Sequence, residues 1–225
     1  QLTAPRQWEL IETDKPEPVD GQILVRMERV AVCGSDQPPF CGVHKGYPQP
    51  IGTTGDEGLG IVEACPSGRY QEGERVLLWG FDRGLFQEYV LADDKGGCIR
   101  LPTDLPEEKV LMSQLLGTVI QSFYKPGNII DQDVLVIGQG PVGLLFNAVL
   151  RNLGARRIIA LDKLDYRLEV GRRMGATHVI NPAQQDPATA VAQITGGAMA
   201  DLVIEAVGIT DTLNLVPSLC RRNAQ

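Results

Sequence analysis

The chain has 225 residues, of which 43% are hydrophobic and 22% are charged, and it carries a net charge of −7. This composition is ordinary for a globular protein, and the length is enough for two modest domains. The negative charge argues against nucleic acid or an anionic membrane as the main partner. No segment approaches the roughly 20 apolar residues that span a bilayer, so no membrane-spanning segment is expected.

The compartment is inferred from the N-terminus and the cysteines. Residues 1–5 contain neither a basic leader nor an apolar core, so no signal peptide is expected. The sequence has five cysteines and no C-x-x-C pair. An odd count without such pairs argues against a disulfide framework and against a four-cysteine zinc site. We therefore expect a cytoplasmic protein.

The first hundred residues predict short β-strands separated by glycine and proline turns. Residues 22–30 partly alternate between apolar and polar side chains, as in a strand with one solvent-exposed face. Three further stretches have a similar character: 58–64, 75–79 and 85–91. Short strands of this kind favour a small barrel.

A helix is predicted to follow the barrel. A proline and two acids at residues 106–108 are typical of a first helical turn, with Thr103 or Asp104 as its cap. The helical pattern continues to Phe123 and is expected to carry the chain from one domain to the next. We place the two domains at 1–118 and 119–225.

From Asp133 onward, apolar strands alternate with amphipathic helices, which predicts a right-handed parallel α/β unit. The strands are expected near 134–137, 157–161, 178–180 and 201–205, and the helices near 141–153, 164–174, 186–195 and 210–220. A full doubly wound fold has about six strands. We therefore expect the sequence to be cut inside this second domain, and to lack a few residues before Gln1 because it has no initiating Met.

A glycine-rich turn joins the first of these strands to its helix. Gly138 permits a tight turn, and Gly140 lets the backbone approach a pyrophosphate. Gly143 allows close packing of the helix on the strand. The free N–H groups and the positive end of the helix dipole would then face the phosphates. The next strand ends on Asp162, nineteen residues after Gly143. A carboxylate there can bind a ribose diol and repels a 2′-phosphate, so NAD is favoured over NADP.

Several motifs, taken together and in this order, resemble the medium-chain dehydrogenase/reductase family, which includes the zinc alcohol, polyol and sugar dehydrogenases. They are Val32-Cys33-Gly34-Ser35-Asp36, Gly55-Asp56-Glu57-Gly58, Gly73-Glu74-Arg75-Val76, Phe86-Gln87-Glu88-Tyr89-Val90, Gly175-Ala176-Thr177 and Glu205-Ala206-Val207-Gly208. The resemblance covers essentially the whole chain. It implies a GroES-like barrel followed by a partial Rossmann domain, and an oxidoreductase that moves a hydride between NAD and an alcohol, polyol or sugar hydroxyl. It also implies a set of cofactor-binding residues: Gly138, Gly140, Pro141, Val142, Gly143, Asp162 and Val207.

The resemblance further implies a metal site with altered ligands. In zinc-bearing relatives the position of Cys33 is a thiolate ligand, and that of Ser35 passes on the proton of the substrate hydroxyl. Asp56 stands where relatives have a histidine ligand, Glu57 stands beside it as in relatives, and Gln114 aligns with a third ligand. Thiolate, carboxylate and neutral amide give a ligand charge of −2, the same as thiolate, imidazole and glutamate. We therefore expect a metal, zinc by resemblance, although a neutral amide is a poor ligand.

Other readings stay open. Without a metal, Cys33 would be a small buried hydrophobe, and the chain would resemble a zincless reductase of quinones or activated double bonds. A nucleotide-binding protein without catalysis is the third reading. His44 could be a replacement ligand or a solvent-exposed loop residue, and His178 is expected to be structural. The partners expected are a small-molecule substrate and, in the full-length protein, further copies of the chain.

Overall fold

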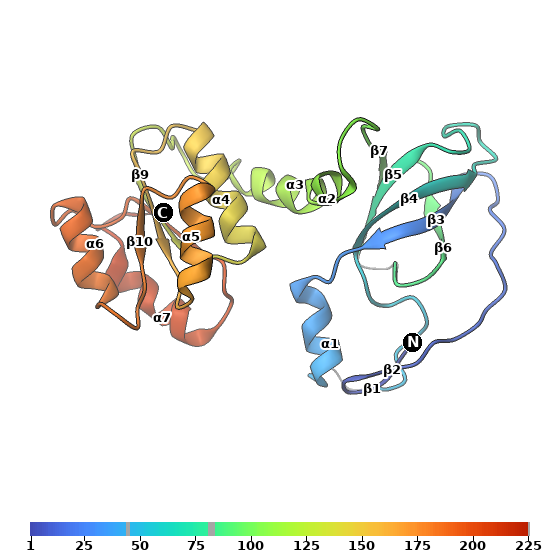
Figure 1. Cartoon of the computed structure of the whole chain (residues 1–225), viewed down its shortest axis with the longest axis horizontal. Coiled ribbons are helices and arrows are strands. Elements are labelled where there is room, and N and C mark those ends of the chain that lie inside the picture. The colour runs from blue at the N-terminus through green and yellow to red at the C-terminus, as the bar shows by residue number, and fades with distance from the viewer. Residues whose placement is uncertain (44–45, 81–83, 225) are drawn as a thin grey trace. The chain divides into compact units, whose positions relative to one another are not determined.

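The computed structural model describes residues 1–43, 46–80 and 84–224, which fall into two compact units, Gln1–Gln114 and Leu115–Gln225 (Figure 1). His44 and residues 81–83 lie outside the described residues. Within the described residues, the structure contains no helix with the length and apolar character that a membrane span requires.

The first unit is built on a five-stranded antiparallel sheet in the order β6-β3-β4-β5-β7, which forms a half-barrel (Figure 1). Its strands are β3 (Gln22–Val30), β4 (Glu57–Ala64), β5 (Arg75–Trp79), β6 (Tyr89–Asp93) and β7 (Cys98–Arg100). Apolar side chains from these strands and from Leu85 fill one core, which confirms the small barrel expected from the sequence. Two short strands, β1 (Leu2–Ala4) and β2 (Gln7–Trp8), pair with each other near the N-terminus.

Glycines in β4 allow it to lie close to β3. A Cβ at Gly58 would stand 2.7 Å from the Met27 Cε, and one at Gly60 would overlap the Arg26 carbonyl oxygen. The pairing shifts register between Met27 and Arg29, as a bulge does. Gly60 in particular leaves no room for a side chain, because the obstacle there is main chain of β3.

Two predictions for the first unit need correction. The strand predicted over 85–91 is β6, and it begins only at Tyr89. The preceding residues form a loop, in which Gln87 N donates to the Leu85 carbonyl at 2.8 Å instead of to a neighbouring strand. Leu85 is fully buried, so its apolar character reflects a core position in a loop.

The predicted helix from Pro106 to Phe123 is two helices, α2 (Glu107–Leu111) and α3 (Ser113–Ser122). The break falls at Met112, the C-cap of α2, where the Val110 carbonyl accepts both the Met112 amide and the Ser113 hydroxyl. The predicted caps Thr103 and Asp104 are wrong, because the N-cap is Pro106 and has no side-chain cap. The proposed domain boundary at residue 118 and the change of unit at Gln114 both fall in α3.

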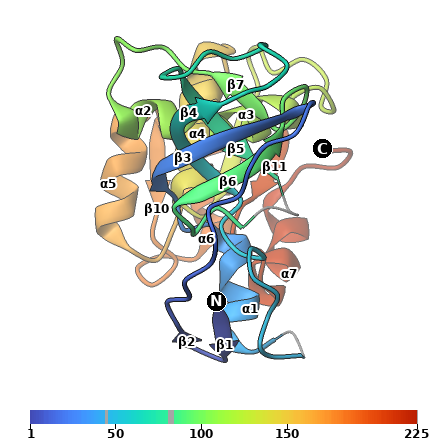
Figure 2. The same cartoon turned by 90° about the vertical axis from the view of Figure 1, so that its right-hand side faces the viewer.

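The second unit is a four-stranded parallel sheet in the order β10-β9-β8-β11 with helices on both faces (Figures 1 and 2). The strands are β8 (Asp133–Ile137), β9 (Arg157–Leu161), β10 (His178–Ile180) and β11 (Leu202–Glu205). The helices are α4 (Pro141–Asn152), α5 (Asp165–Arg173), α6 (Pro187–Thr195) and α7 (Thr210–Leu219). Every predicted end in this unit is confirmed to within one residue.

Side chains along β8 alternate between two cores. Val134 and Val136 pack with α4 and α5, whereas Leu135 and Ile137 pack with α6 and α7. All four are fully buried. A parallel strand covered on both faces must be apolar on both, and this explains the continuous apolar run in the sequence.

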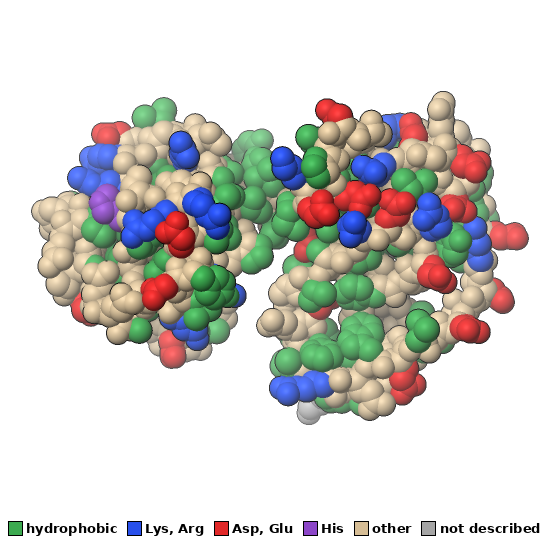
Figure 3. Space-filling view, in the orientation of Figure 1, with side chains coloured by type: hydrophobic (Ala, Val, Ile, Leu, Met, Phe, Trp, Pro, Cys, Tyr) green, Lys and Arg blue, Asp and Glu red, His purple; other side chains and the backbone are tan. Residues whose placement is uncertain are grey.

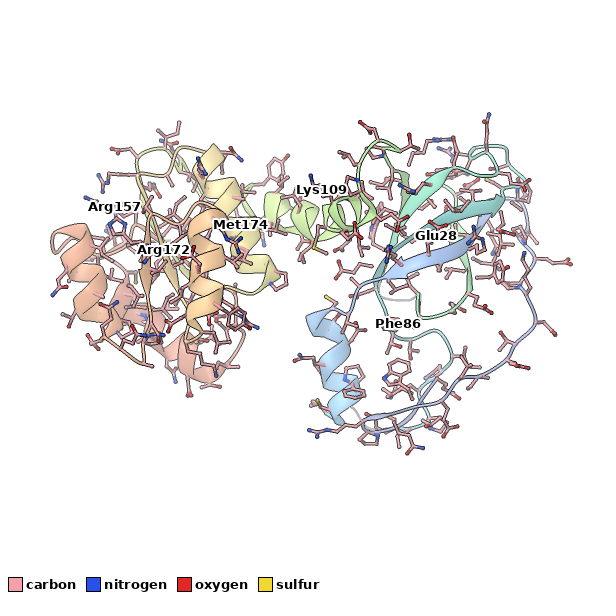
Figure 4. All side chains as sticks on the ribbon, viewed as in Figure 1. Glu28, Phe86, Lys109, Arg157, Arg172 and Met174 are labelled. Carbon is pink, nitrogen blue, oxygen red and sulfur yellow. The ribbon has the colours of Figure 1, made fainter. Side chains whose placement is uncertain are left out.

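The N-terminal end of this sheet is held by a buried acid. Asp133 accepts hydrogen bonds from Arg156 and from Arg157, at 2.7 to 3.0 Å. Burial acts to raise the pKa of Asp133, but the hydrogen bonds from the two arginines outweigh it and hold the pKa below its usual range. Figure 4 labels Arg157 at the start of β9.

On the surface of the first unit, acidic and basic side chains are interspersed over the strands (Figure 3), as in the pair of Lys15 with Glu63.

Candidate functional site

The pairing of β3 with β4 brings the two motifs of the first unit together. Val30, the last residue of β3, pairs with Gly58, the second residue of β4. The Ala31 amide then donates to the Glu57 carbonyl at 3.0 Å. Cys33 follows three residues after the end of β3, at the start of a short 3-10 turn, Gly34–Asp36. The sheet register therefore places Cys33 beside Asp56 and Glu57.

Cys33, Asp56 and Glu57 form one group, in which a ligand atom of each lies within 4.8 Å of the others. Glu57 is only 4% exposed, while Cys33 and Asp56 are half-buried. One oxygen of each carboxylate, Asp56 Oδ1 and Glu57 Oε2, is buried and has no hydrogen-bond partner within the described part of the chain. A buried carboxylate oxygen without a partner is unfavourable, so this group has unused capacity to bind a cation.

Acidic side chains lie close together in this group, and their surroundings shift the pKa of Glu57. Burial is the main cause that raises the pKa of Glu57 above its ordinary value. A hydrogen bond with the Cys33 side chain acts in the opposite direction, and the negative charges of Asp56 and Asp36 add to the rise. A divalent cation would reverse this balance, because it favours the ionised form of every group around it.

Ser35 lies at the exposed side of this group. Its hydroxyl donates to Asp56 Oδ2 at 2.9 Å. A hydroxyl that donates one hydrogen bond can still accept another, so Ser35 can contact a substrate hydroxyl while it remains bonded to Asp56. The predicted catalytic residues Cys33, Ser35, Asp56 and Glu57 are thus neighbours in the structure; their roles stay predictions.

Asp36 is a site residue that the sequence reading missed. Its carboxylate accepts the Cys33 amide at 2.8 Å and the Gly55 amide at 2.9 Å. It therefore joins the turn that carries Cys33 to the turn that carries Asp56. The signal in the sequence was its place three residues after the N-cap Cys33, where an acidic side chain bonds back to the cap amide.

An aromatic pair supports the same turn. Gly55 has a φ of +80°, and a Cβ there would lie 2.9 Å from the Phe86 ring. Phe86 in turn meets Trp8 edge to face, with ring centroids 5.7 Å apart. Figure 4 shows Phe86 pointing from its loop into the space between the sheet and the N-terminal strands. The aromatic packing therefore leaves room only for glycine beside Asp56.

Gln114 lies in the first turn of α3 and is half-buried. Its assignment as the third ligand stays a prediction. The alternative ligand His44 is outside the described residues. His178 begins β10, where its Nδ1 shares a hydrogen bond of 2.9 Å with the Thr177 hydroxyl, as a structural histidine would.

The glycine turn of the second unit has the geometry that its sequence predicts. Gly138 has a φ of +91°, in the left-handed region that favours glycine. A Cβ at Gly143 would overlap the Gly138 carbonyl oxygen, whereas one at Gly140 would meet nothing within 4 Å. Gly140 is also the N-cap of α4, with Pro141 and Val142 opening the helix. The surface above Gly140 is therefore open, next to the free N–H groups of the helix.

Asp162 lies beside this turn and is 7% exposed. Its carboxylate accepts the Gln139 amide at 2.8 Å and the Leu164 amide at 2.9 Å. The Arg167 Nη1 also lies 3.8 Å from Asp162 Oδ2. A carboxylate has about four acceptor positions, so the two amides leave capacity for an external donor. Val207 follows β11 and faces the turn from the other side, because a Cβ at Gly138 would stand 2.6 Å from its Cγ2. The residues predicted to bind the dinucleotide thus gather at the carboxyl ends of the strands, where such ligands bind.

A buried amide pair under the turn was also missed. Gln139 is fully buried, and its Oε1 accepts the Asn147 Nδ2 at 2.7 Å. Its Nε2 donates to the Gly138 carbonyl at 3.1 Å. On α5, a Cβ at Gly171 would lie 2.7 Å from the same Oε1. The side chain of Gln139 thus links the turn to α4 by hydrogen bonds and packs against α5 at Gly171.

Comparison with known proteins agrees with both units. The family described as alcohol dehydrogenase GroES-like domain matches residues 19–103, and the family described as zinc-binding dehydrogenase matches residues 141–225. The chain is 29% identical over 236 residues to L-threonine 3-dehydrogenase of Pyrococcus horikoshii, covering 91% of this chain and 67% of that protein. It is 32% identical to an alcohol dehydrogenase of Cupriavidus necator, covering 88% of this chain and 67% of that protein. The chain thus spans about two thirds of the length of these curated relatives.

Solved structures show the same architecture. The alcohol dehydrogenase of Thermus sp. ATN1 superimposes with a TM-score of 0.86 at 26% identity, covering 99% of this chain and 74% of that one. A protein of Sinorhizobium meliloti, solved bound to NADP, has a TM-score of 0.87 at 22% identity, covering 99% of this chain and 73% of that one. At that identity the second likeness concerns the fold alone. Both confirm the GroES-like and Rossmann arrangement expected from the sequence.

Proposed function

This chain belongs to the medium-chain zinc-type alcohol dehydrogenase family, and we propose that the protein of which it is part is an NAD-dependent oxidoreductase of an alcohol, polyol or sugar hydroxyl. The observation that carries the proposal is the group of Cys33, Asp56 and Glu57, with Ser35 at its exposed side. Such a donor set, beside a hydroxyl that can still accept a hydrogen bond, is suited to a substrate that must lose a proton and a hydride.

The second unit supplies the dinucleotide site in this proposal. The open backbone at Gly140 and the N-terminus of α4 bind the pyrophosphate, because their N–H groups and the helix dipole favour an anion. Asp162 accepts hydrogen bonds from the adenosine ribose with its remaining acceptor capacity. NAD is preferred because a 2′-phosphate would be repelled by the carboxylate.

The first unit supplies the substrate site. Cys33 and Asp56 hold a divalent metal, zinc by family, and the third position is filled by Glu57, by Gln114 or by water. When bound, such an ion acts as a Lewis acid toward a hydroxyl oxygen. Ser35 Oγ accepts the hydroxyl proton of the substrate while its own proton is directed to Asp56 Oδ2, so a proton can leave through this pair. NAD supplies the hydride chemistry, and the protein provides alignment.

The proposal is tested with the full-length protein. Reduction of NAD is followed with a panel of alcohols, polyols and sugars that includes L-threonine, since relatives are named for threonine and for alcohols. Metal per chain is measured by elemental analysis on the same preparation. We expect turnover with at least one hydroxyl substrate, together with about one metal ion per active site.

Two outcomes would support the rival functions. Metal-free protein that reduces a quinone or an activated double bond would favour a zincless reductase. Dinucleotide binding without turnover of any substrate in either panel would favour a nucleotide-binding protein. The oligomeric state of the full-length protein, which we propose to be a homo-oligomer, is measured in the same preparation by light scattering.

A further inference from the structure

We propose that Gln139 is a positioning residue for the dinucleotide, which couples the acceptor of the adenosine ribose to the turn that receives the pyrophosphate. Its main-chain N–H holds Asp162, and its side chain holds the glycine turn against α4. This inference rests on the dinucleotide site of the proposed function. It deepens that function by giving a role to the residue between the first two glycines, whose side chain is fully buried.

The main chain of Gln139 fixes one oxygen of the ribose acceptor. Its amide donates to Asp162 Oδ2 at 2.8 Å, while the preceding amide, of Gly138, donates to the Leu161 carbonyl at 2.7 Å. Two consecutive N–H groups of the turn are therefore bonded to the end of β9. A shift of residue 139 would move the Asp162 carboxylate with it.

The side chain of Gln139 fixes the turn to the elements on either side of it. Its Nε2 donates to the Gly138 carbonyl at 3.1 Å and to the Val136 carbonyl of β8 at 3.3 Å. Its Oε1 accepts the Asn147 Nδ2 of α4 at 2.7 Å. The Gly138 carbonyl also lies against α4, where a Cβ at Gly143 would overlap it. One amide group thus ties the turn to the strand before it and to the helix whose N-terminus would face the phosphates.

The polar pair of Gln139 and Asn147 is not the arrangement that packing alone favours. Both side chains are fully buried, and Asn147 Oδ1 has no hydrogen-bond partner within the described part of the chain. A buried amide oxygen without a partner is unfavourable, and two apolar side chains of similar size would fill the space without that cost. They could not donate a hydrogen bond to the Gly138 carbonyl. The cost therefore points to a gain in the position of the turn, because departures from the best packing are expected at functional sites.

The gain expected from this arrangement is preorganisation. Ribose and pyrophosphate are joined in one ligand, so their two subsites must keep a fixed spacing, and residue 139 belongs to both. Groups that are held in place before binding lose little conformational freedom when the ligand arrives. Loss of the Gln139 amide should therefore weaken dinucleotide binding, although its side chain contacts only the protein.

The experiment compares affinity with stability in variants of the full-length protein. Gln139→Met keeps nearly the length of the side chain without its amide, and Asn147→Leu removes the partner of that amide. The double variant has an apolar pair, so its free energy of unfolding should return close to that of the wild type. We expect its affinity for NAD and for ADP to stay weaker by about 10-fold, the equivalent of one net hydrogen bond. Calorimetry measures the affinities, and urea unfolding measures the stability.

The link to the ribose acceptor has its own measurement. In an Asp162→Ala background, Gln139→Met should weaken NAD binding by a smaller factor than it does alone, because residues of one network are not additive. An equal factor in both backgrounds would show that Gln139 does not act through Asp162, and the proposed coupling would be overturned.

Two further variants complete the set. Asn152→Leu is the matched control, because it makes the same change in the same helix at an exposed residue that donates only to the Ala148 carbonyl among its printed neighbours in α4. It should leave NAD affinity within about 2-fold. Gln139→Ala, which only removes atoms, is the second variant should the double variant fail to fold, and it should weaken NAD binding by about the same 10-fold.

The results separate the inference from the proposed function. If the double variant regains stability and binds NAD as the wild type does, or if Gln139→Ala binds it equally well, Gln139 has only a structural role. The inference is then overturned while the NAD-dependent oxidoreductase stands. If the wild type binds neither NAD nor ADP, the dinucleotide site itself is rejected, and the inference is rejected with it.

Discussion

Asp162 offers a dinucleotide a carboxylate that is already held in place. Bonds from the Gln139 and Leu164 amides fix both of its oxygens before any ligand arrives. A fixed acceptor binds a ribose diol with little loss of side-chain entropy, because its rotamer does not have to be selected on binding. In the proposed site, the same fixation would keep the negative charge near a 2′-phosphate, although Arg167 Nη1 lies 3.8 Å from Asp162 Oδ2.

Asp162→Ser combined with Lys163→Arg should therefore weaken NAD binding and narrow its advantage over NADP. Loss of hydrogen bonds to a charged acceptor corresponds to about 1.5–3 kcal/mol, or roughly 10- to 150-fold in affinity. Calorimetry with NAD and with NADP measures the ratio of their dissociation constants. A wild type that prefers NADP would show that the role given to Asp162 is wrong.

Gly140→Val should abolish dinucleotide binding while it leaves the fold nearly unchanged. The structure offers no steric obstacle to the new side chain, since a Cβ at Gly140 meets nothing within 4 Å and the backbone φ of −74° is ordinary. The valine would instead fill the space that the pyrophosphate needs. Titration with NAD checks the affinity, and circular dichroism checks the fold. Unchanged affinity would place the phosphates elsewhere.

At the scale of elements, the start of β8 depends on the ionised form of Asp133. Its folded pKa is lower than its ordinary value, so it contributes stability that is complete above the ordinary value and is lost as the pH falls through the folded pKa. The contribution of Asp133 to the free energy of unfolding is therefore lost at acidic pH. β8 lies between β9 and β11 in the sheet, so Asp133 stands at the start of an inner strand.

Asp133→Asn should lower the free energy of unfolding at neutral pH by about 1–3 kcal/mol. The expected loss is smaller than that from breaking a fully buried ion pair, because Arg156 and Arg157 are partly exposed and solvent screens their charges. The difference from the wild type should shrink as the pH is lowered below about 4. Urea unfolding at several pH values measures this. A difference that is constant with pH would contradict the assigned cause.

The packing of α4 and α5 on the glycine turn depends on the fit of Gln139 against Gly171. Gly171→Ala alone should destabilise the protein by about 1–3 kcal/mol, because the new Cβ would stand 2.7 Å from the Gln139 Oε1. In a Gln139→Ala background the same change should become neutral or stabilising, since alanine favours helix over glycine by about 1 kcal/mol. A double-mutant cycle measures the coupling. Additive effects would show that the two positions are independent.

The sequence predicts the elements of the second unit better than those of the first. Parallel strands such as β8 are buried on both faces, so their apolar runs end where the strand ends. In the first unit, Leu85 is apolar because it fills the core from a loop, and no local pattern distinguishes this from a strand. The break at Met112 accompanies a local hydrogen bond from the Ser113 hydroxyl to the Val110 carbonyl, which the apolar periodicity of residues 106–123 does not reveal.

At the scale of the molecule, the sequence predicts which residues meet in the candidate site but not what supports them. Cys33, Asp56 and Glu57 are recognisable by motif, and strand pairing brings them together. Asp36 and Gln139 act through contacts with residues nineteen and eight positions away, and spacing alone does not show such contacts. Whether Gln114 joins the ligands depends on packing that its sequence position does not determine.

Each unit has its own cores and its own candidate site, so each ligand should protect a different set of amides from hydrogen exchange. At 100 times its dissociation constant a ligand stabilises its site by about 2.7 kcal/mol. NAD should slow exchange in 138–144 and in β9, and Zn²⁺ should slow it in 31–36 and 55–58. Mass spectrometry of deuterium uptake checks this. Protection by Zn²⁺ in 138–144 alone would contradict the assignment of the metal site.

The close approach of Gly171 to Gln139 also constrains how this sequence can change over time. A side chain at residue 171 is costly while a long amide occupies position 139, so shortening of residue 139 is expected to come first. Asn147 would then lose the acceptor of its hydrogen bond and would itself be under selection for replacement. Descendants of this gene should therefore change the three positions in that order, and an alignment of its relatives should show residues 139, 147 and 171 varying together.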